Sequence, residues 1–515
     1  MRRGGYLDRG RNQMGKKVVI IGGGISGMTT GIYLQLNGYD TLIVEKNAVP
    51  GGACTGWERG GCYIDGCIHW MTGVNPGSSY YDLWRDTGAI DDNTEIYFQD
   101  DFARFDFGGG RGFTVWADVD RLQAELLAFA PEDEKEIRRF CKLVRRFQRI
   151  EGPVDKPVDH MSLPRLIKVA VTMGGDYYWV SRMSKVGCAE YAKKFRNEYL
   201  RSFFESYMAP GYNLMSMLYM LAHVTAHNGG IPIGGSRPLA ERMAKRYTSL
   251  GGKFRLGAEA ERVRIEGRRA TGVELAGGEF IPADWVVSSV AAEHCLKKLL
   301  GGRYPVRKID DRLGDRKTYP IYTYTTAVFR ADADLSDKPL GAHVHFDEPI
   351  TLDREYRAVT LRNYSYDKTM KRPAGTSVLQ AGILGGDDMY FWWKRKKDDG
   401  TYKAAKEAFA ADVLRIAEER YPEYRGRLTV IDVITPCTYE RYLNSRHGSF
   451  QGFVHTAAGK SLSEKGVIKG LDNFLLSGQC IFHSGGMPPA AITGRFAAQR
   501  ICKRDGKKFI YRERS

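Results

Sequence analysis

Three cysteines and a histidine lie close together near the start of the chain. Cys54, Cys62, Cys67 and His69 fall within the glycine-rich segment 50–73. Thiolates and imidazoles are typical zinc ligands, and structural zinc sites usually carry paired ligands such as Cys-x2-Cys on one short turn. The spacings here are 8, 5 and 2 residues, with no such pair. We therefore predict no metal site and expect each cysteine to be a buried thiol.

A second glycine-rich stretch has the pattern that binds phosphate. Gly22, Gly24 and Gly27 follow an apolar run over 16–21, a helical pattern continues to Asn37, and a second apolar run ends at Glu45. In such a turn the first glycine permits the tight bend, the second admits a pyrophosphate, and the third lets the helix pack closely. The helix N-terminus faces the phosphates, and the acid accepts hydrogen bonds from a ribose hydroxyl.

This pattern predicts a dinucleotide-binding fold and does not by itself separate FAD from NAD. The residues expected at the cofactor from this part of the chain are Gly22, Gly24, Ile25, Ser26, Gly27, Glu45 and Lys46.

The next loop distinguishes the two cofactors. Gly51 and Gly52 follow Glu45 by six and seven residues, and a run Gly-Gly-x-Tyr-x-Asp-x-x-Ile-His spans 60–69. This order resembles the two-dinucleotide-binding flavoproteins, and within them is most similar to phytoene desaturases, carotenoid isomerases and retinol saturases. The resemblance implies FAD, with the loop lying along its pyrophosphate and flavin. It assigns cofactor contacts to Gly51, Gly52, Ala53 and His69.

Two residues depart from the family pattern. Ala53 stands where many members carry arginine, and Cys67 stands where the family has glycine. Because Cys67 lies beside the predicted flavin loop, it is the cysteine for which a redox role is considered.

The far end of the chain resembles the closing segment of the same family. Residues 474–477 are predicted to form a buried strand, and a helix is predicted to begin at Pro488, where proline is tolerated in the first turn. Thr493 stands where serine is usual. The resemblance places Gly478, Gln479, Gly486, Met487, Pro488 and Ala491 near the flavin, and Val263 near the adenine. His69 and His483 are the polar candidates for catalysis, although a structural role is also expected for each.

The predicted fold class is α/β. We expect a Rossmann-like two-dinucleotide-binding FAD domain with an interleaved α+β substrate domain. The FAD domain is assigned to 14–85, 225–305 and 455–515, the substrate domain to 86–224, expected to be helical, and 306–454, and a disordered leader to 1–13. Residues 262–289 are predicted to form three strands separated by turns.

The net charge of +16 raises the question of a partner. Residues 134–150 combine apolar side chains at helical spacing with many arginines, which suits an anionic membrane surface or packing onto a core. No nucleic-acid-binding signature is present, so nucleic acid is not expected. Unpaired cysteines and the lack of a long apolar run predict a cytoplasmic protein, soluble or peripheral to a membrane. The sequence does not indicate an oligomeric state.

Three functions are considered. The favoured one is an FAD-dependent oxidoreductase that desaturates, saturates or isomerises carbon–carbon bonds of a long polyene or isoprenoid-like lipid. A flavin amine oxidase is the first alternative, and it would need an aromatic cage beside the flavin. A non-catalytic flavin-containing protein of the membrane surface is the second.

Overall fold

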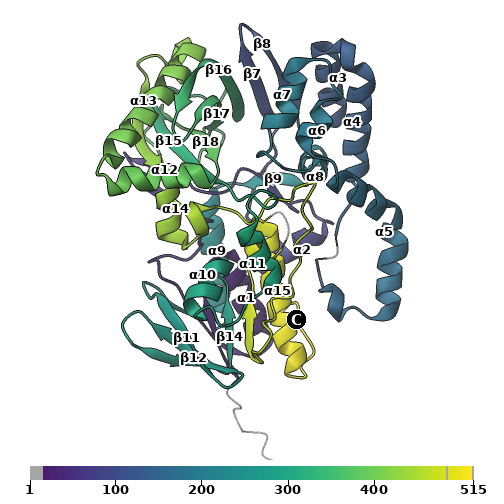
Figure 1. Cartoon of the computed structure of the whole chain (residues 1–515), viewed down its shortest axis with the longest axis vertical. Coiled ribbons are helices and arrows are strands. Elements are labelled where there is room, and N and C mark those ends of the chain that lie inside the picture. Colours follow the sequence, from purple (N-terminus) through teal and green to yellow (C-terminus); the bar gives the residue numbers. More distant parts are fainter. Residues whose placement is uncertain (1–14, 153, 483–484, 513–515) are drawn as a thin grey trace, which may run out of the picture.

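The computed structural model describes residues 15–152, 154–482 and 485–512. Its lower part in Figure 1 is built on a five-stranded parallel sheet. The strands come from distant parts of the chain, and their order is β10 (Lys253–Arg255), β2 (Asp40–Val44), β1 (Lys17–Ile21), β14 (Trp285–Ser288) and β20 (Phe474–Leu476). Because both faces are covered, the central strands read as continuous apolar runs.

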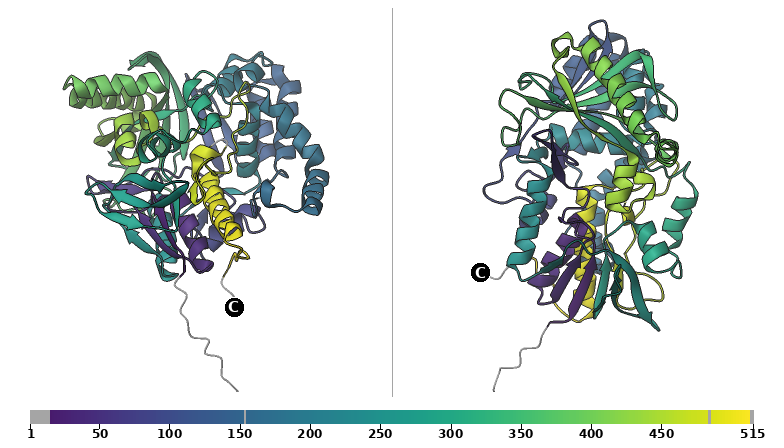
Figure 2. Two further views of the ribbon diagram at one scale, coloured as in Figure 1. Left: turned by 60° about the horizontal axis from the view of Figure 1, so that its bottom comes forward. Right: turned by 90° about the vertical axis from the view of Figure 1, so that its left-hand side faces the viewer.

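Helices cover one face of this sheet and a β-meander covers the other. On the first face, α1 (Ile25–Leu36) packs against α9 (Ser236–Ser249) and α15 (Met487–Arg504), as Figure 2 shows for α1 and α15. The second face packs against β11 (Ala260–Glu266), β12 (Arg269–Leu275) and β13 (Phe280–Pro282). The prediction of three strands over 262–289 was wrong, because the chain leaves the meander after Pro282 and then forms a fourth strand, β14, in the parallel sheet.

The upper part contains a seven-stranded sheet. Its order is β19 (Leu428–Ile434), β15 (Thr323–Ala331), β18 (Ser377–Gly385), β17 (Glu355–Asn363), β16 (Gly341–Thr351), β7 (Asp101–Gly108) and β8 (Arg111–Trp116). The stretch 86–224 was expected to be helical, yet it supplies β7 and β8. The β7–β8 hairpin joins the sheet by parallel pairing with β16. Helices α12 (Asp387–Asp398) and α13 (Tyr402–Arg420) pack against the sheet.

A helical lobe follows the β7–β8 hairpin. It contains α3 (Val119–Phe129), α4 (Glu134–Phe147), α5 (Leu163–Ser184), α6 (Cys188–Ala192), α7 (Glu198–Ser206) and α8 (Leu214–Thr225). The apolar side chains of α4 that the sequence offered for a membrane, such as Phe140 and Val144, are fully buried in the lobe's core. Helix α5 instead projects from the body along one side (Figure 1).

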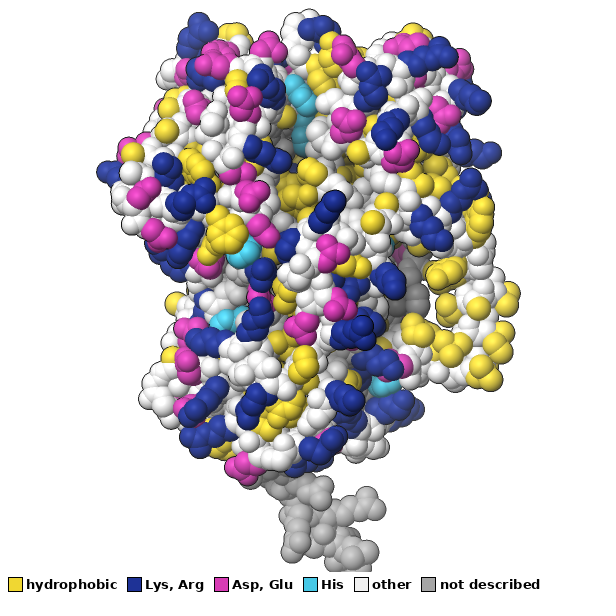
Figure 3. All heavy atoms as spheres, in the orientation of Figure 1, with side chains coloured by type: hydrophobic (Ala, Val, Ile, Leu, Met, Phe, Trp, Pro, Cys, Tyr) yellow, Lys and Arg dark blue, Asp and Glu magenta, His cyan; other side chains and the backbone are white. Residues whose placement is uncertain are grey.

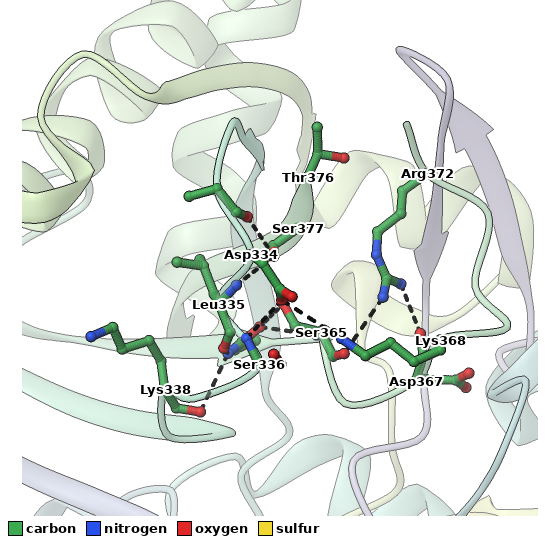
Figure 4. A network of polar contacts seen from close by, with 12 residues as sticks. Asp334, Leu335, Ser336, Lys338, Ser365, Asp367, Lys368, Arg372, Thr376 and Ser377 are labelled. Carbon is green, nitrogen blue, oxygen red and sulfur yellow. Dashed lines mark hydrogen bonds and ion pairs between the residues drawn. The ribbon is translucent and has the colours of Figure 1, made fainter. Parts of the chain in front are cut away.

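Polar contacts join the upper and lower parts. In the network of Figure 4, the Ser377 hydroxyl donates to the carbonyl of Ala333 at 2.8 Å, and Arg372 donates to the carbonyl of Asp367 at 2.7 Å. The Asp367 carboxylate in turn accepts the backbone N–H of Gly234 at 2.6 Å, just before α9. The loop 364–377 of the upper sheet is thereby fixed to the helix that covers the cofactor sheet.

Candidate cofactor and substrate site

A cavity of about 1260 Å³ runs from the parallel sheet to helix α5. One end is lined by the glycine-rich turn after β1, and the other by residues of α5 and α8. Ligand pockets for a single small molecule commonly occupy about 300–1,000 Å³. This cavity therefore has room for a dinucleotide and a second, long ligand.

The dinucleotide end is shaped by contacts between two glycine-rich loops. Gly22 has a φ of +100°, which permits the tight turn, and its N–H donates to the carbonyl of Val44 on the neighbouring strand at 2.8 Å. The N–H of Gly51 donates to the carbonyl of Gly23 at 2.9 Å, so the second loop lies directly against the first. A Cβ on Gly27 would stand 1.9 Å from the Gly22 carbonyl oxygen, which explains the third glycine.

Glu45 is held in place by backbone and amide donors. It is 6% exposed, its Oε2 accepts the N–H of Gly23 at 2.7 Å, and its Oε1 accepts the N–H and side-chain amide of Asn47, both at 2.8 Å. A carboxylate has about four acceptor positions, so one remains for a ribose hydroxyl. The Nζ of Lys46 is already engaged, because it donates to the carbonyl of Arg441 and to the Asn444 side chain.

The far end of the chain closes the same cavity. Gly478 donates its N–H to the Thr493 hydroxyl at 2.9 Å, so threonine serves where the family pattern has serine. The Gln479 side chain accepts the N–H of Gly486 at 2.6 Å and donates to the carbonyl of Phe450 at 3.1 Å. These bonds hold the loop before α15 and direct the helix N-terminus at the cavity.

Most of the residues assigned to the cofactor from sequence line this one cavity. They are Gly22, Gly24, Ile25, Ser26, Glu45, Lys46, Gly51, Gly52, Ala53, His69, Gly478, Gln479, Gly486, Met487 and Pro488. Gly27, Val263 and Ala491 lie behind the wall and are not part of the lining. Near Val263, the lining residues are Ala258, Glu259 and Ala260. His483 lies outside the described residues.

The geometry fits FAD. Gly24 has room on its cavity side, since an added Cβ would find its nearest protein atoms, Gly51 O and Gly52 Cα, at 3.8 Å. The hydroxyl of Ser26, at the N-terminus of α1, is buried and has no hydrogen-bond partner among the described residues. A helix N-terminus with unfilled donors and an adjacent glycine loop is the arrangement that binds a pyrophosphate.

His69 lies on the cavity wall as a neutral side chain. Burial lowers the pKa of its imidazole well below the usual value, and Arg362 lowers it further. Its Nδ1 is buried and has no hydrogen-bond partner among the described residues, while its carbonyl accepts the Gln99 amide at 3.0 Å. A neutral imidazole with an unfilled Nδ1 can exchange a hydrogen bond with a bound ligand.

Sequence reasoning did not assign the second half of the cavity, which we call the apolar arm. It is lined by Tyr80, Ile150, Val154, Met173, Tyr177, Val180, Met208, Tyr212, Met215, Tyr219, Met220, Phe450 and Phe496. The density of aromatic residues and methionines over 199–224 was the available signal. That signal does not separate a cavity wall from a core, because both need the same side chains.

Among the described residues, no group of three or more His, Cys, Asp or Glu side chains is arranged to hold a metal ion. Comparison with known proteins identifies the cofactor chemistry instead. The profile of the family described as flavin containing amine oxidoreductase matches residues 25–502. The chain belongs to this family. It is an FAD-dependent oxidoreductase, as the sequence motifs predicted, and its fold is the predicted FAD domain with a substrate domain.

Curated relatives cover nearly the whole chain. The neurosporene-forming phytoene desaturase of Rhodobacter capsulatus is 26% identical over 94% of this chain and 94% of its own length. The chloroplastic prolycopene isomerase of Daucus carota is 21% identical over 94% of this chain and 79% of its own. Among solved structures, cyclohexylamine oxidase from Brevibacterium oxydans shares the fold, with a TM-score of 0.58, 15% identity, and coverage of 96% of this chain and 100% of that one.

Proposed function

We propose that this chain acts on carbon–carbon bonds of a long hydrophobic polyene or isoprenoid-like substrate. The observation that carries the proposal is the apolar arm, which extends the cofactor cavity as far as α5. Tyrosine, methionine and aliphatic side chains suit an extended hydrocarbon. The names of the relatives, which include desaturases and an isomerase of carotenoids, support the same substrate class.

An amine substrate is disfavoured by the charges of the cavity. Its carboxylates among the described residues are Glu45, Asp159, Glu259 and Glu464. Glu45 and Glu259 lie at the dinucleotide end. Asp159 pairs with Arg500 at 2.6 Å, and Glu464 pairs with Lys308 at 2.7 Å. The apolar arm therefore offers an ammonium group no free carboxylate, although its tyrosines could contribute to an aromatic cage.

The chain's residues chiefly position the substrate and exclude water. Bound FAD supplies two-electron chemistry at carbon. Burial raises the pKa of Tyr80 to about 12 and raises the pKa of Tyr219 well above its usual value, so both phenols remain protonated at neutral pH. His69 is neutral, and we propose that it orients the bound ligands through its unfilled Nδ1. This arrangement is compatible with desaturation, saturation and isomerisation.

The test is product analysis with the FAD-loaded protein. Polyenes of different saturation are supplied in liposomes under anaerobic conditions, with the flavin either oxidised or reduced. The products are then extracted, and their masses are measured by mass spectrometry. Loss of two hydrogens, gain of two, or a rearrangement without mass change identifies the reaction. Peroxide release with amines but no change in any polyene would contradict the proposal. A flavin that is never reduced or reoxidised would favour the non-catalytic alternative.

We further propose that the substrate enters from an anionic membrane through α5. Val171 and Tyr177 on this helix are 77% and 71% exposed, and Leu163 and Ile167 are also exposed. Figure 3 shows hydrophobic side chains along the projecting helix, with basic side chains gathered above it. Tyr177 also lines the cavity, so the exposed apolar surface and the cavity mouth are continuous. None of the helices among the described residues is long and apolar enough to span a bilayer.

A basic groove between α4 and α5 supplies charge complementarity. It is lined by Arg139, Lys142, Arg145, Arg146, Arg149, Arg182 and Lys194, with Asp176 as its acidic residue. A basic side chain near an anionic surface contributes about 1 kcal/mol, and a fully inserted apolar side chain about 1.5–3 kcal/mol. The face of α4 that carries its arginines, rather than its buried apolar face, would therefore meet the lipid.

Sedimentation with liposomes tests this surface. The wild-type protein should bind vesicles containing phosphatidylglycerol and bind pure phosphatidylcholine weakly. Val171→Asp should reduce binding by about tenfold or more, since it replaces an inserting side chain by a charge that costs several kcal/mol to bury. Val49→Asp is the matched control, because Val49 is exposed in the loop after β2 and is not part of α5. Equal binding of both variants and wild type would contradict the assignment.

A further inference from the structure

Two cysteines lie at the base of a hairpin on the cofactor cavity. Strands β3 (Gly56–Arg59) and β4 (Cys62–Asp65) pair antiparallel, with Gly56 opposite Asp65 and Arg59 opposite Cys62. Beyond the strands, the N–H of Gly66 donates to the carbonyl of Thr55 at 2.9 Å. Cys54 and Cys67 follow just outside this hydrogen bond, where the chain leaves the hairpin and the N–H of Cys67 donates to the Asp65 carboxylate at 3.0 Å.

This cross-strand position suits a disulfide. In antiparallel pairs, hydrogen-bonded positions alternate with non-hydrogen-bonded ones, where facing side chains are closest. Thr55 and Gly66 are joined by a hydrogen bond, so an extension of the ladder beyond them would bring Cys54 and Cys67 to the closer kind of position. Facing Cβ atoms there are about 4.5 Å apart, and a disulfide needs about 3.5–4.5 Å. The bond therefore requires only a small adjustment of the backbone.

The two thiols are neighbours and differ in exposure. The Cys54 thiol is 2% exposed and donates to the Ser236 carbonyl at 3.3 Å, and Cys67 packs against the hydrophobic cluster that contains Cys54. The neighbouring Cys67 thiol and burial raise the pKa of Cys54, so Cys54 keeps its proton. Cys67 is half-buried, and both residues line the cavity. Cys67 is therefore the sulfur that a small oxidant meets first.

We propose that Cys54 and Cys67 form a redox-active dithiol that closes reversibly to a disulfide, with a peroxide as the oxidant. The Cys67 sulfur attacks one peroxide oxygen and the O–O bond breaks. One water is released, and Cys67 becomes a sulfenic acid. The Cys54 sulfur then attacks that sulfenic acid, the S–O bond breaks, a second water leaves, and the S–S bond forms. Two thiols and one hydrogen peroxide thus give one disulfide and two waters.

A disulfide between Cys54 and Cys67 would affect the cofactor end of the cavity. Cys54 follows the Gly51–Gly52 loop that lies against Gly24, and its N–H donates to the Gly51 carbonyl at 3.1 Å. Cys67 precedes Ile68 and His69 on the cavity wall. A disulfide would therefore tie the loop along the dinucleotide to the loop that carries His69. Oxidation would stiffen the cofactor wall without closing the apolar arm.

Thiol mapping of the FAD-loaded protein tests the proposal. The protein is treated with a small excess of hydrogen peroxide, alkylated, digested without reduction and analysed by mass spectrometry. A peptide pair joined through Cys54 and Cys67 is expected, with the other seven cysteines alkylated, and dithiothreitol should restore both thiols. Cys62→Ser, at the other end of the hairpin, is the matched control and should still form the bond.

The variants Cys67→Ser and Cys54→Ser separate the two steps. Cys67→Ser should leave Cys54 alkylated after peroxide, because the exposed sulfur is missing. Cys54→Ser should leave Cys67 as a sulfenic acid that a dimedone probe captures. Recovery of both wild-type cysteines as alkylated thiols, or as separate sulfinic acids, would overturn the proposal. So would cross-linking of Cys67 to Cys62 as readily as to Cys54.

Discussion

Replacement of Gly24 by alanine separates folding from cofactor binding. Gly24 has φ −74° and ψ −178°, a conformation that any residue adopts. The new Cβ would find its nearest protein atoms at 3.8 Å, an ordinary van der Waals contact. A Gly→Ala change at a compatible site stabilises by about 0.4–1 kcal/mol through the unfolded chain. We therefore expect the FAD-free variant to be as stable as the wild type or slightly more stable.

The same methyl group should weaken FAD binding. It stands between Gly24 and the Gly51–Gly52 loop, on the wall where a pyrophosphate must approach the backbone. Forcing an extra methyl group into a filled site costs about 1–3 kcal/mol. Because about 1.4 kcal/mol corresponds to a tenfold change in affinity, the Kd for FAD should rise by about 5- to 150-fold.

Two other glycines provide the comparison. In Gly27→Ala the added Cβ would lie 1.9 Å from the Gly22 carbonyl oxygen, so α1 must move away from β1 and both stability and FAD content should fall. In Gly386→Ala, at φ −95° before α12, the added Cβ meets nothing within 4 Å. That variant should bind FAD like the wild type and should show at most the same small gain in stability as Gly24→Ala.

The assay combines urea unfolding of the FAD-free proteins with FAD titration followed by flavin fluorescence. The expected pattern is a folded Gly24→Ala variant with weakened binding, an unstable Gly27→Ala variant, and a Gly386→Ala variant that binds FAD like the wild type. A well-folded Gly24→Ala protein with wild-type FAD affinity would refute the reasoning that this turn binds the pyrophosphate.

Three further predictions concern the rest of the site. Glu45→Gln should raise the Kd for FAD by about tenfold, since hydrogen bonds to a charged group contribute about 1.5–3 kcal/mol, and titration by flavin fluorescence measures it. Met215→Trp should fill part of the apolar arm and lower turnover of long polyenes more than short ones, while flavin content, measured by absorbance, stays unchanged. Burial lowers the pKa of His223 from 6.5 to about 4, so the folded state resists its protonation. Stability should be unaffected by this group above pH 6.5 and should fall by about 3 kcal/mol as the pH drops to 4. Urea midpoints across that range should decline less steeply in His223→Gln.

Sequence patterns were sufficient to predict the parts of the site whose residues are contiguous in the chain. The turn from Gly22 to Gly27 and the acid at Glu45 work through backbone within one β-α-β unit, so spacing alone identifies their tasks. The loop before α15 is also contiguous, and its predicted helix start at Pro488 lies one residue from the observed start at Met487. Residues such as Val263 were less predictable, because a strand pattern does not show which side chains reach the cavity.

A pattern of apolar residues along the chain does not show which other elements of the fold bury those residues. Helix α4 has a strong apolar stripe, and the core of the helical lobe covers it. Helix α5 mixes apolar and basic residues and leaves Val171 and Tyr177 exposed. Similarly, β7 looks like part of a helical insertion until it pairs with β16 from more than two hundred residues later.

The sequence by itself predicted a dinucleotide cofactor and the turn that binds its phosphates, because glycine spacing and a following acid are local requirements, and the family resemblance specified FAD. Only the tertiary structure brought the beginning, middle and end of the chain into one parallel sheet, and only it opened the apolar arm between that sheet and α5. The tertiary structure also decided how the cysteines are interpreted. Spacing along the chain excluded a paired zinc motif, whereas the β3–β4 hairpin brings Cys54 and Cys67, which flank its two strands, to the same end, because antiparallel pairing joins residues that sequence distance keeps apart.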